Sequence, residues 1–225
     1  MASVVEIWRY PVKSMAGERL ESCMVTPSGL DGDRRWALVD GTAHRAGKLL
    51  GIKHHERLLT YRASLADGRV SVATPGAAPA ELDGDLVRRL EVESSRPLQL
   101  RDLPGGNFDD AHVLLVNLAS VAALSLEAGI LVDRRRFRAN LYVDGLEPEE
   151  EVAWAGRRIR AGEAELDVVS RCVRCVVITK DPDTTETSPE LLRLLAERHD
   201  ESMGVYCQVV RPGHVAVGDH VGVLT

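Results

Sequence analysis

The sequence predicts a mainly β protein with a few inserted α-helices, and three observations support this fold class. Short segments rich in Val, Leu and Thr recur along the chain and are bounded by Gly, Asp or Pro, which is typical of strands joined by turns. Few segments carry helix start and stop signals. Strands and helices do not alternate regularly, which argues against a doubly wound sheet. We therefore expect a mostly antiparallel barrel or sandwich.

The first hundred residues carry mainly strand signals. Residues 4–10 and 36–40 are expected to form strands, the second ending at Gly41. Asp67-Gly68 separates two further candidates, 57–63 and 69–73, and predicts a hairpin. The remaining expected features are a Pro/Ala-rich loop at 74–79, a short helix at 85–91 and a boundary loop at 104–107. This loop suggests two domains, residues 1–100 and 101–225.

The second half contains two helix signals among further strands. Asn117 is the expected N-cap of a helix over 118–128, which Gly129 ends. Ser188-Pro189-Glu190 starts a second helix that runs to about His199. The segments expected to form strands are 112–116, 137–143, 157–160, 163–169, 176–179, 206–210 and 215–223.

Composition restricts the function classes. A net charge of −6 over 225 residues argues against general nucleic-acid binding, which needs a basic surface. No apolar run approaches the roughly 18–20 residues of a membrane span, and the N-terminus lacks the basic-then-apolar order of a signal peptide. We expect a cytoplasmic protein that does not bind membranes and whose four cysteines are reduced. Cys23 and Cys207 are expected to be core residues.

The most informative segment is Arg171-Cys172-Val173-Arg174-Cys175, which precedes a β-branched run at 176–179. A C-x-x-C spacing alone suggests a redox pair or half of a zinc site. The redox motif usually opens a helix, whereas this run predicts a strand. A zinc site would need a second Cys or His pair at a suitable spacing, and the histidines provide none. A thiolate held for a soft metal centre fits the segment better.

Several motifs occur in an order and spacing that resemble a known family. In chain order they are Tyr10-Pro11-Val12-Lys13-Ser14, Gly29-Leu30-Asp31-Gly32-Asp33-Arg34-Arg35-Trp36, Phe137-Arg138-Ala139-Asn140, Cys172-Val173-Arg174-Cys175, Asp181-Pro182-Asp183-Thr184, Pro212-Gly213 and Val217-Gly218-Asp219. On these motifs the chain resembles the MOSC family of molybdenum cofactor sulfurase C-terminal domains. It is most similar to the branch that includes the mitochondrial amidoxime reducing component. This resemblance implies an N-terminal MOSC-type β-barrel domain packed on a C-terminal MOSC β-barrel domain.

The resemblance also implies a molybdenum cofactor, in which molybdenum is held by a phosphate-bearing molybdopterin, bound between the two halves. Cys175 corresponds to the thiolate that ligates molybdenum and so acts as metal ligand and catalytic residue. The other cofactor-binding residues it implies are Lys13, Ser14 and Arg34 at the phosphate end, Arg138 and Asn140 in the pocket, and Asn117 and Ser120 as a looser match. Where relatives carry a Thr-Ala/Gln-Arg segment, this chain reads Ala43-His44-Arg45, so the contact is assigned to Arg45.

Residue chemistry agrees with part of this assignment. A buried phosphate needs charge-assisted donors, which Arg, Lys and Ser supply. Taken alone, however, Lys13 and Arg34 are more often solvated surface charges. The run Arg134 to Arg136 is expected to be a solvated face or to pair with the acidic stretch 147–151. Asp181 and Asp183 flank a proline, and a turn role is the default.

The expected function is a molybdenum-dependent oxidoreductase that reduces N-hydroxylated substrates such as amidoximes or hydroxylamines. Since the chain shows no cysteine spacing for an iron–sulfur centre and no dinucleotide fingerprint, electrons are expected to come from a separate electron-transfer protein or reductase. The alternative is a molybdenum cofactor or persulfide sulfur carrier without substrate turnover. In that case pyridoxal phosphate is expected only on a separate sulfur-donor protein. A third possibility is a thiol redox protein with a reversible Cys172–Cys175 disulfide.

Overall fold

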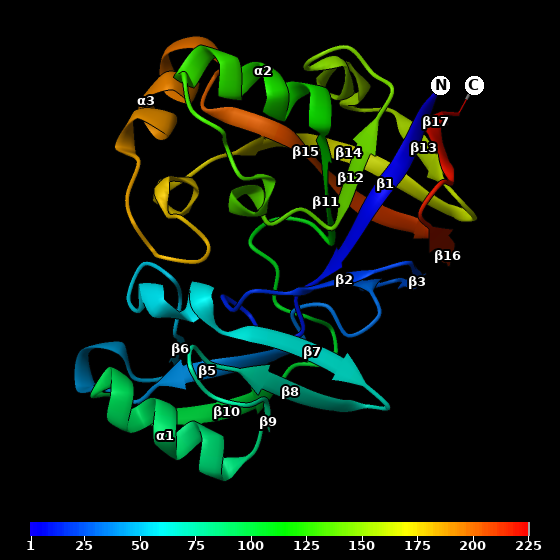
Figure 1. The fold of residues 1–225 in the computed structure, drawn as a ribbon. Coiled ribbons are helices and arrows are strands. Elements are labelled where there is room, and N and C mark those ends of the chain that lie inside the picture. The colour runs from blue at the N-terminus through cyan, green and yellow to red at the C-terminus, as the bar shows by residue number, and fades with distance from the viewer. Residues whose placement is uncertain (225) are drawn as a thin grey trace.

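Seven strands close into a barrel that uses both ends of the chain (Figure 1). The computed structural model describes residues 1–224. The strand order is β12-β11-β15-β14-β13-β17-β1, and antiparallel pairing of β1 with β12 closes the ring. These strands are β1 (Ala2–Arg9), β11 (Val113–Asn117), β12 (Leu141–Asp144), β13 (Arg158–Ala161), β14 (Ala164–Val173), β15 (Ser202–Arg211) and β17 (His220–Val223).

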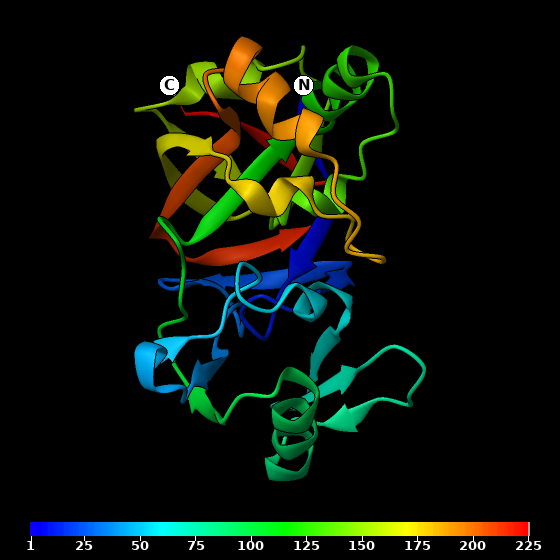
Figure 2. The same ribbon diagram turned by 90° about the vertical axis from the view of Figure 1, so that its left-hand side faces the viewer.

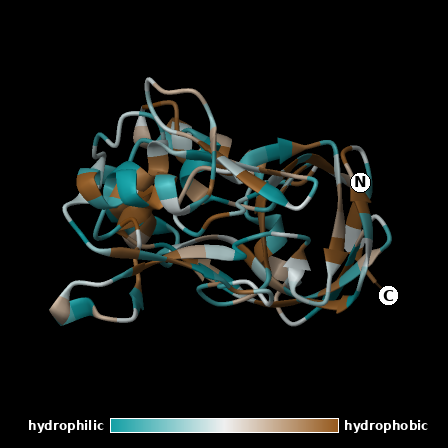
Figure 3. Cartoon of the chain, turned by 90° about the horizontal axis from the view of Figure 1, so that it is seen from below, coloured by the Kyte–Doolittle hydropathy of each residue, from teal (hydrophilic) through white to brown (hydrophobic). Residues whose placement is uncertain are grey.

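The barrel closes because alternate side chains of its strands point to one shared interior. The interior side chains, which have no exposed surface, include Val4, Ile7, Leu115, Leu141, Leu166 and Val205. Figure 3 shows these strands carrying brown, hydrophobic stretches around the N and C labels. The mainly β prediction is therefore confirmed, and the first strand of the chain is an integral part of the barrel.

Two α-helices cover one side of the barrel, and both start where the sequence predicts. The Asn117 side chain accepts a 3.0 Å hydrogen bond from the N–H of Ala119, and Gly129 ends the helix with φ 66°. Pro189 occupies the first turn of the other helix. The helices are α2 (Leu118–Ala128) and α3 (Pro189–Arg198), and the 3₁₀ turns nearby are η3 (Arg134–Phe137), η4 (Glu150–Trp154) and η5 (Val176–Thr179).

The remaining strands form three small sheets that lie beside the barrel, below it in Figures 1 and 2. One contains β16 (Gly213–Ala216), β3 (Ser22–Thr26) and β4 (Gly29–Leu30); the second contains β10 (Leu98–Asp102), β5 (Trp36–Asp40) and β6 (Lys48–Leu49); the third contains β7 (Arg62–Ala66), β8 (Arg69–Ala73) and β9 (Ala80–Glu81). The other elements are β2 (Glu18–Leu20), which pairs with β1, helix α1 (Gly84–Ser94), and the 3₁₀ turns η1 (Ala43–Arg45) and η2 (Glu56–Thr60). The hairpin at Asp67-Gly68 and the helix expected near 85–91 are both present. The division at residue 100 stays a prediction.

Besides the segment 176–179, which forms η5, three expected strands are wrong in whole or in part. Residues 56–60 form η2, because Leu58 and Leu59 are neighbours and both buried, which a helical turn permits and strand alternation does not. Phe137 ends η3, and a positive φ of 55° at Arg138 delays the strand until Leu141. The segment 215–223 is two strands, separated by a turn at Gly218 with φ 94°.

In residues 1–224 no helix combines the length and apolarity that a membrane crossing requires.

A buried carboxylate, Asp40, fixes the segment that follows β5. Its side chain has no exposed surface and accepts hydrogen bonds from Thr42 (2.6 Å), Arg45 (3.1 Å) and Arg96 (2.7 Å). Burial alone would raise the pKa of Asp40, but the bonds from Thr42 and the charge of Arg96 lower this pKa to about 2. Asp40 therefore ties η1 to β5 and to the end of α1.

We expect Asp40→Asn to lower the free energy of unfolding at pH 6–7 by about 2 kcal/mol, because the native state lowers the pKa of this carboxyl by about two units. A lowered pKa stabilises the native state above the unfolded pKa near 4, and this contribution is lost as the pH falls towards 2. The difference between wild type and Asp40→Asn, measured by urea denaturation, should thus shrink to near zero at pH 2. The control is Asp102→Asn, which removes an exposed pair with Arg35 and should cost less than about 1 kcal/mol at every pH. A difference for Asp40→Asn that does not change with pH would contradict this account.

Candidate functional site

A cavity of about 460 Å³ lies between the two halves of the chain. From the first half it is lined by Lys13, Ser14, Arg34 and the segment 49–54. The second half contributes Arg138, Asn140, the segment 172–175 and Tyr206, among others. Of the nine site residues that the sequence suggested, six therefore line one cavity: Lys13, Ser14, Arg34, Arg138, Asn140 and Cys175. Cys172, whose role was left open, lines it too.

Lys13 and Ser14 follow β1 in a tight turn. The Lys13 ammonium donates to the Asp109 carboxylate at 2.8 Å and to the Asn107 carbonyl at 3.2 Å. Ser14 has a positive φ of 73° and is 93% buried, being 7% exposed. Within residues 1–224, neither its hydroxyl nor its backbone N–H has a hydrogen-bond partner. Two donors of Ser14 are thus free to bind a ligand in the cavity.

Arg34 joins the two halves. Its guanidinium pairs with the buried Asp33 carboxylate and donates to Asn140 Oδ1 at 3.3 Å and to the Arg138 carbonyl at 3.1 Å. Asn140 completes the network, since its Nδ2 donates to Asp33 Oδ2 at 3.0 Å and its Oδ1 accepts from the Leu114 N–H. The hydrogen-bonding groups of both side chains already have protein partners. Arg34 and Asn140 therefore hold the cavity wall in place and also contribute polar surface to it.

Arg138 differs from Arg34 in having no counter-ion. Its guanidinium lies 4.5 Å from the centre of the Tyr10 ring and makes no ion pair or side-chain hydrogen bond within the described chain. Burial and the nearby charge of Arg34 lower the pKa of Arg138 to about 10, so it remains a cation at neutral pH. A desolvated cation without an anion is costly, and this group is therefore suited to bind an anionic ligand.

The two cysteines of the C-x-x-C segment line the same cavity with different exposure. Cys175 is exposed, whereas Cys172 is 1% exposed. The Arg174 guanidinium donates to Cys172 Sγ at 2.7 Å and to the Phe137 carbonyl at 2.7 Å. Burial and the neighbouring Cys172 raise the pKa of Tyr206, so that phenol keeps its proton at neutral pH. Cys175 is thus the accessible sulfur of the cavity.

The segment after Cys175 corrects the strand expected at 176–179. Residues 176–179 form the 3₁₀ turn η5, with Ile178 and Thr179 buried. The Arg136 guanidinium donates to the carbonyl of Thr179 at 2.9 Å and to that of Ile178 at 3.4 Å. A cation that satisfies the last carbonyls stabilises a helical turn, which outweighs the strand preference of the β-branched run.

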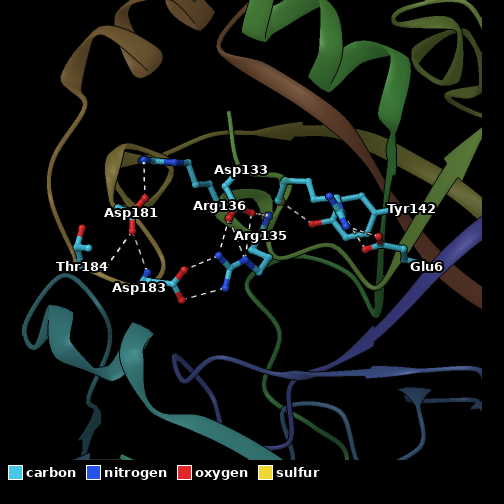
Figure 4. Close-up of polar contacts among 9 residues, drawn as sticks. Glu6, Asp133, Arg135, Arg136, Tyr142, Asp181, Asp183 and Thr184 are labelled. Atoms are coloured by element: carbon cyan, nitrogen blue, oxygen red, sulfur yellow. Dashed lines mark hydrogen bonds and ion pairs between the residues drawn. The ribbon is translucent and has the colours of Figure 1, made fainter. Parts of the chain in front are cut away.

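The sequence suggested that the arginines at 134–136 form a solvated face or pair with the stretch 147–151. Each of them instead pairs with an acidic residue outside that stretch, although Arg134 is exposed. Figure 4 shows Arg136 reaching Asp181 and Arg135 lying between Asp133 and Asp183. The expected turn at Asp181 is present, because its Oδ1 accepts from the N–H groups of Asp183 and Thr184 at 3.0 Å. These pairs anchor the loop after η5, and with it Cys175, onto η3.

Three candidates lie outside the lining of this cavity. Asn117 caps α2 and donates to the Glu147 carbonyl at 2.7 Å, while Ser120 donates to the buried Glu151 carboxylate at 3.1 Å. Both side chains stabilise the contact between α2 and η4. Arg45 bonds Asp40, the Leu49 carbonyl and His54, so it contacts the cavity lining at Leu49 and His54 without belonging to it.

Other lining residues escaped the sequence reasoning, namely Lys53, His54, Asp109, Arg136, Arg174 and Tyr206. Two signals were visible for them, namely the basic cluster Lys53-His54-His55 and the place of Arg174 between the two cysteines. With them, six Lys and Arg residues but a single carboxylate line the cavity, in a chain whose net charge is −6. The cavity therefore favours an anionic ligand that also has an atom to which the Cys175 sulfur can bind.

Comparison with known proteins agrees with the motifs. A family model described as the MOSC domain matches residues 101–222, and one described as the MOSC N-terminal beta barrel domain matches residues 1–111. Molybdenum cofactor sulfurase of Caenorhabditis elegans is 28% identical over 91% of this chain and 33% of its own length. The chain thus spans about a third of the sulfurases it matches.

Shorter relatives are matched over most of their length. Mitochondrial amidoxime-reducing component 1 of Homo sapiens is 26% identical over 100% of this chain and 83% of its own length. Among solved structures, the YUAD protein from Bacillus subtilis has a TM-score of 0.55 at 16% identity and covers 98% of this chain and 94% of its own. At that identity the likeness shows the fold alone.

We expect Arg34→Met to lower the free energy of unfolding by about 3 kcal/mol, because it leaves the buried Asp33 charge without its cation. The adjacent Arg35→Met is the matched control, since it removes an exposed pair with Asp102 and a contact with the Trp36 ring and should cost about 1 kcal/mol or less. Urea denaturation at pH 7 measures both. Equal losses in the two variants would contradict the role given to Arg34.

Proposed function

The chain belongs to the MOSC domain family, and on that premise we propose that it binds molybdenum cofactor in the cavity between its halves and reduces N-hydroxylated substrates such as amidoximes or hydroxylamines. In this reaction the N–O bond breaks, two electrons and two protons are taken up, and water leaves. The observation that carries the proposal is the meeting of an exposed Cys175 with unpaired cationic and hydroxyl donors in one cavity.

The donor set fits the phosphate-bearing end of such a cofactor. Ser14 offers a free hydroxyl and N–H, Lys13 an ammonium and Arg138 an unpaired guanidinium. Gly51 adds space, because a Cβ built on it would meet only Ser14 Oγ and His54 Nδ1, each 3.9 Å away. A phosphate dianion requires several charge-assisted donors and room between them, and this wall of the cavity supplies both.

The opposite wall fits the metal end. Thiolate sulfur is a ligand for soft metal centres, and Cys175 is the sulfur open to the cavity. The Asp181 loop and Arg136 fix the turn that follows it. When bound, the molybdenum cofactor supplies the two-electron redox chemistry.

The remaining residues of the wall would act on substrate and protons. The protonated Tyr206 phenol can donate a hydrogen bond to a polar substrate atom. Phe108, Phe137 and Ile178 give part of the lining an apolar surface, which would strengthen electrostatic interactions with a bound ligand. Electrons would come from a separate electron-transfer protein, and two relatives carry the word "component" in their names.

A second candidate is handling of the cofactor or its sulfur without substrate turnover. It is favoured by the relatives named molybdenum cofactor sulfurase and by a second cavity thiol, Cys172, next to the Arg174 cation. A persulfide on Cys172 or Cys175 would add 32 Da to the intact protein, a shift that mass spectrometry of material without bound pterin would detect.

Expression in a host that makes molybdenum cofactor tests the first candidate. We expect stoichiometric molybdenum by elemental analysis in the wild type and a loss of more than about tenfold in Cys175→Ser, because a hydroxyl is a poor replacement for a soft thiolate ligand. Amidoxime reduction with an artificial electron donor should fall in parallel. Cys23→Ser is the control, since Cys23 lies in the barrel core and outside the cavity lining. A metal-free wild type, or full molybdenum content in Cys175→Ser, would refute the proposal.

A further inference from the structure

Residues 51–54 form one part of the cavity wall. These residues form a turn in which the His54 N–H donates to the Gly51 carbonyl at 2.9 Å. The turn follows β6 and carries Lys53 and His54 into the cavity lining. His54 is solvent-exposed there, so its ring can meet a ligand without moving the fold.

The orientation of the His54 ring is set by Arg45. Arg45 Nη1 lies 2.6 Å from His54 Nε2. A guanidinium can only donate, so Nε2 accepts, and the proton of the neutral ring must be on Nδ1. Arg45 is itself held by Asp40 Oδ2 at 3.1 Å and by the Leu49 carbonyl at 3.2 Å. The relay therefore fixes one tautomer of His54.

The protonated nitrogen and the free hydroxyl of Ser14 both border the space above Gly51. The point where a Cβ of residue 51 would stand is 3.9 Å from His54 Nδ1 and 3.9 Å from Ser14 Oγ. These are the only heavy atoms within 4 Å of that point outside the neighbouring residues. Two hydrogen-bond donors thus flank a space that only glycine leaves open.

The charge around His54 keeps its ring neutral. Partial burial and the charges of Arg45, Arg96 and Lys53 lower the pKa of His54, while only the carboxylate of Asp40 opposes them. The ring is therefore a neutral Nδ1–H donor at pH 7, and it adds a directed hydrogen bond to a wall already rich in cations.

We propose that His54 is an anion-binding residue that, with Ser14 and the space above Gly51, binds a terminal phosphate or similar tetrahedral oxyanion through an Nδ1–H donor fixed by Arg45. This inference rests on the proposed function, because the oxyanion would be the phosphate end of the bound cofactor. It assigns Arg45 a positioning role in place of the direct contact expected from the sequence.

Two substitutions of His54 distinguish the roles of its two ring nitrogens. The amide of His54→Asn can place a donor near the position of Nδ1, whereas that of His54→Gln reaches the position of Nε2 and leaves the cavity side without a donor. Inorganic phosphate is the probe, and its dissociation constant is measured by NMR titration of the cofactor-free protein. We expect His54→Asn to bind phosphate within about threefold of the wild type. His54→Gln should bind at least about tenfold more weakly, as for a lost hydrogen bond to a charged group.

Two further measurements test the hydrogen bond from Arg45 to His54 and the space above Gly51. In ¹⁵N spectra of the wild type, the imidazole of His54 should show the Nδ1–H tautomer at pH 7.5, and Arg45→Met should convert it mainly to the Nε2–H tautomer. Gly51→Ala should weaken phosphate binding at least about tenfold without unfolding the protein, because its Cβ fills the space at ordinary contact distances.

Equal phosphate affinity in His54→Gln and wild type, or an Nε2–H tautomer in the wild type, would overturn the inference, as would a wild type that binds no phosphate. Failure of this inference alone leaves the dependence of molybdenum on Cys175 intact. Failure of the proposed function instead appears as a wild type that binds phosphate through His54 but takes up no molybdenum.

Discussion

The guanidinium of Arg34 is the contact on which the rest of the site depends. It lies between the buried carboxylate of Asp33 and the side chain of Asn140, and it also reaches the carbonyl of Arg138. These bonds fix the first half of the chain against the barrel at the point where the cavity opens. Since Asn140 also accepts from the Leu114 N–H, the network is continuous with the barrel backbone. The position of Arg138, whose carbonyl accepts from Arg34, follows from this junction.

The cavity is electrostatically unlike the protein that contains it. The chain is acidic overall, yet the lining is rich in lysine and arginine. Three of these six cations are paired with a carboxylate, Arg34 with Asp33, Lys13 with Asp109 and Arg136 with Asp181. Arg138 is not, and its pKa is lowered accordingly. An anion bound beside Arg138 would recover the free energy that this cation loses by desolvation. A ligand that also carries a soft metal atom would bind the Cys175 thiol at the other end of the cavity.

Much of this arrangement is predictable from the sequence, and the failures have physical causes. The cap at Asn117 and the stop at Gly129 are local, so the helix between them is predicted correctly. The meeting of the motif residues from Lys13 to Cys175 in one cavity is predictable because the family resemblance carries information about long-range contacts. Asn117 and Ser120 do not join them, since their side chains hydrogen-bond to Glu147 and Glu151 and so hold α2 against η4 and the residues before it. The β-branched run at 176–179 is a helical turn because Arg136, distant in sequence, satisfies its carbonyls. No local pattern distinguishes Arg136 from its neighbours, and none reveals that Arg45 acts through His54.

The central claim is that cations of one wall and a thiol of the other hold the same molecule. The most direct test uses Arg138→Met purified from a host that makes the cofactor. Its molybdenum content and the pterin that it releases on denaturation are measured together. Arg138 is remote from the sulfur in sequence and has no counter-ion of its own. The account predicts that pterin and molybdenum fall together, by about fivefold or more, as expected when one charge-assisted contact is lost. Molybdenum or pterin retained at the wild-type level in this variant would contradict it.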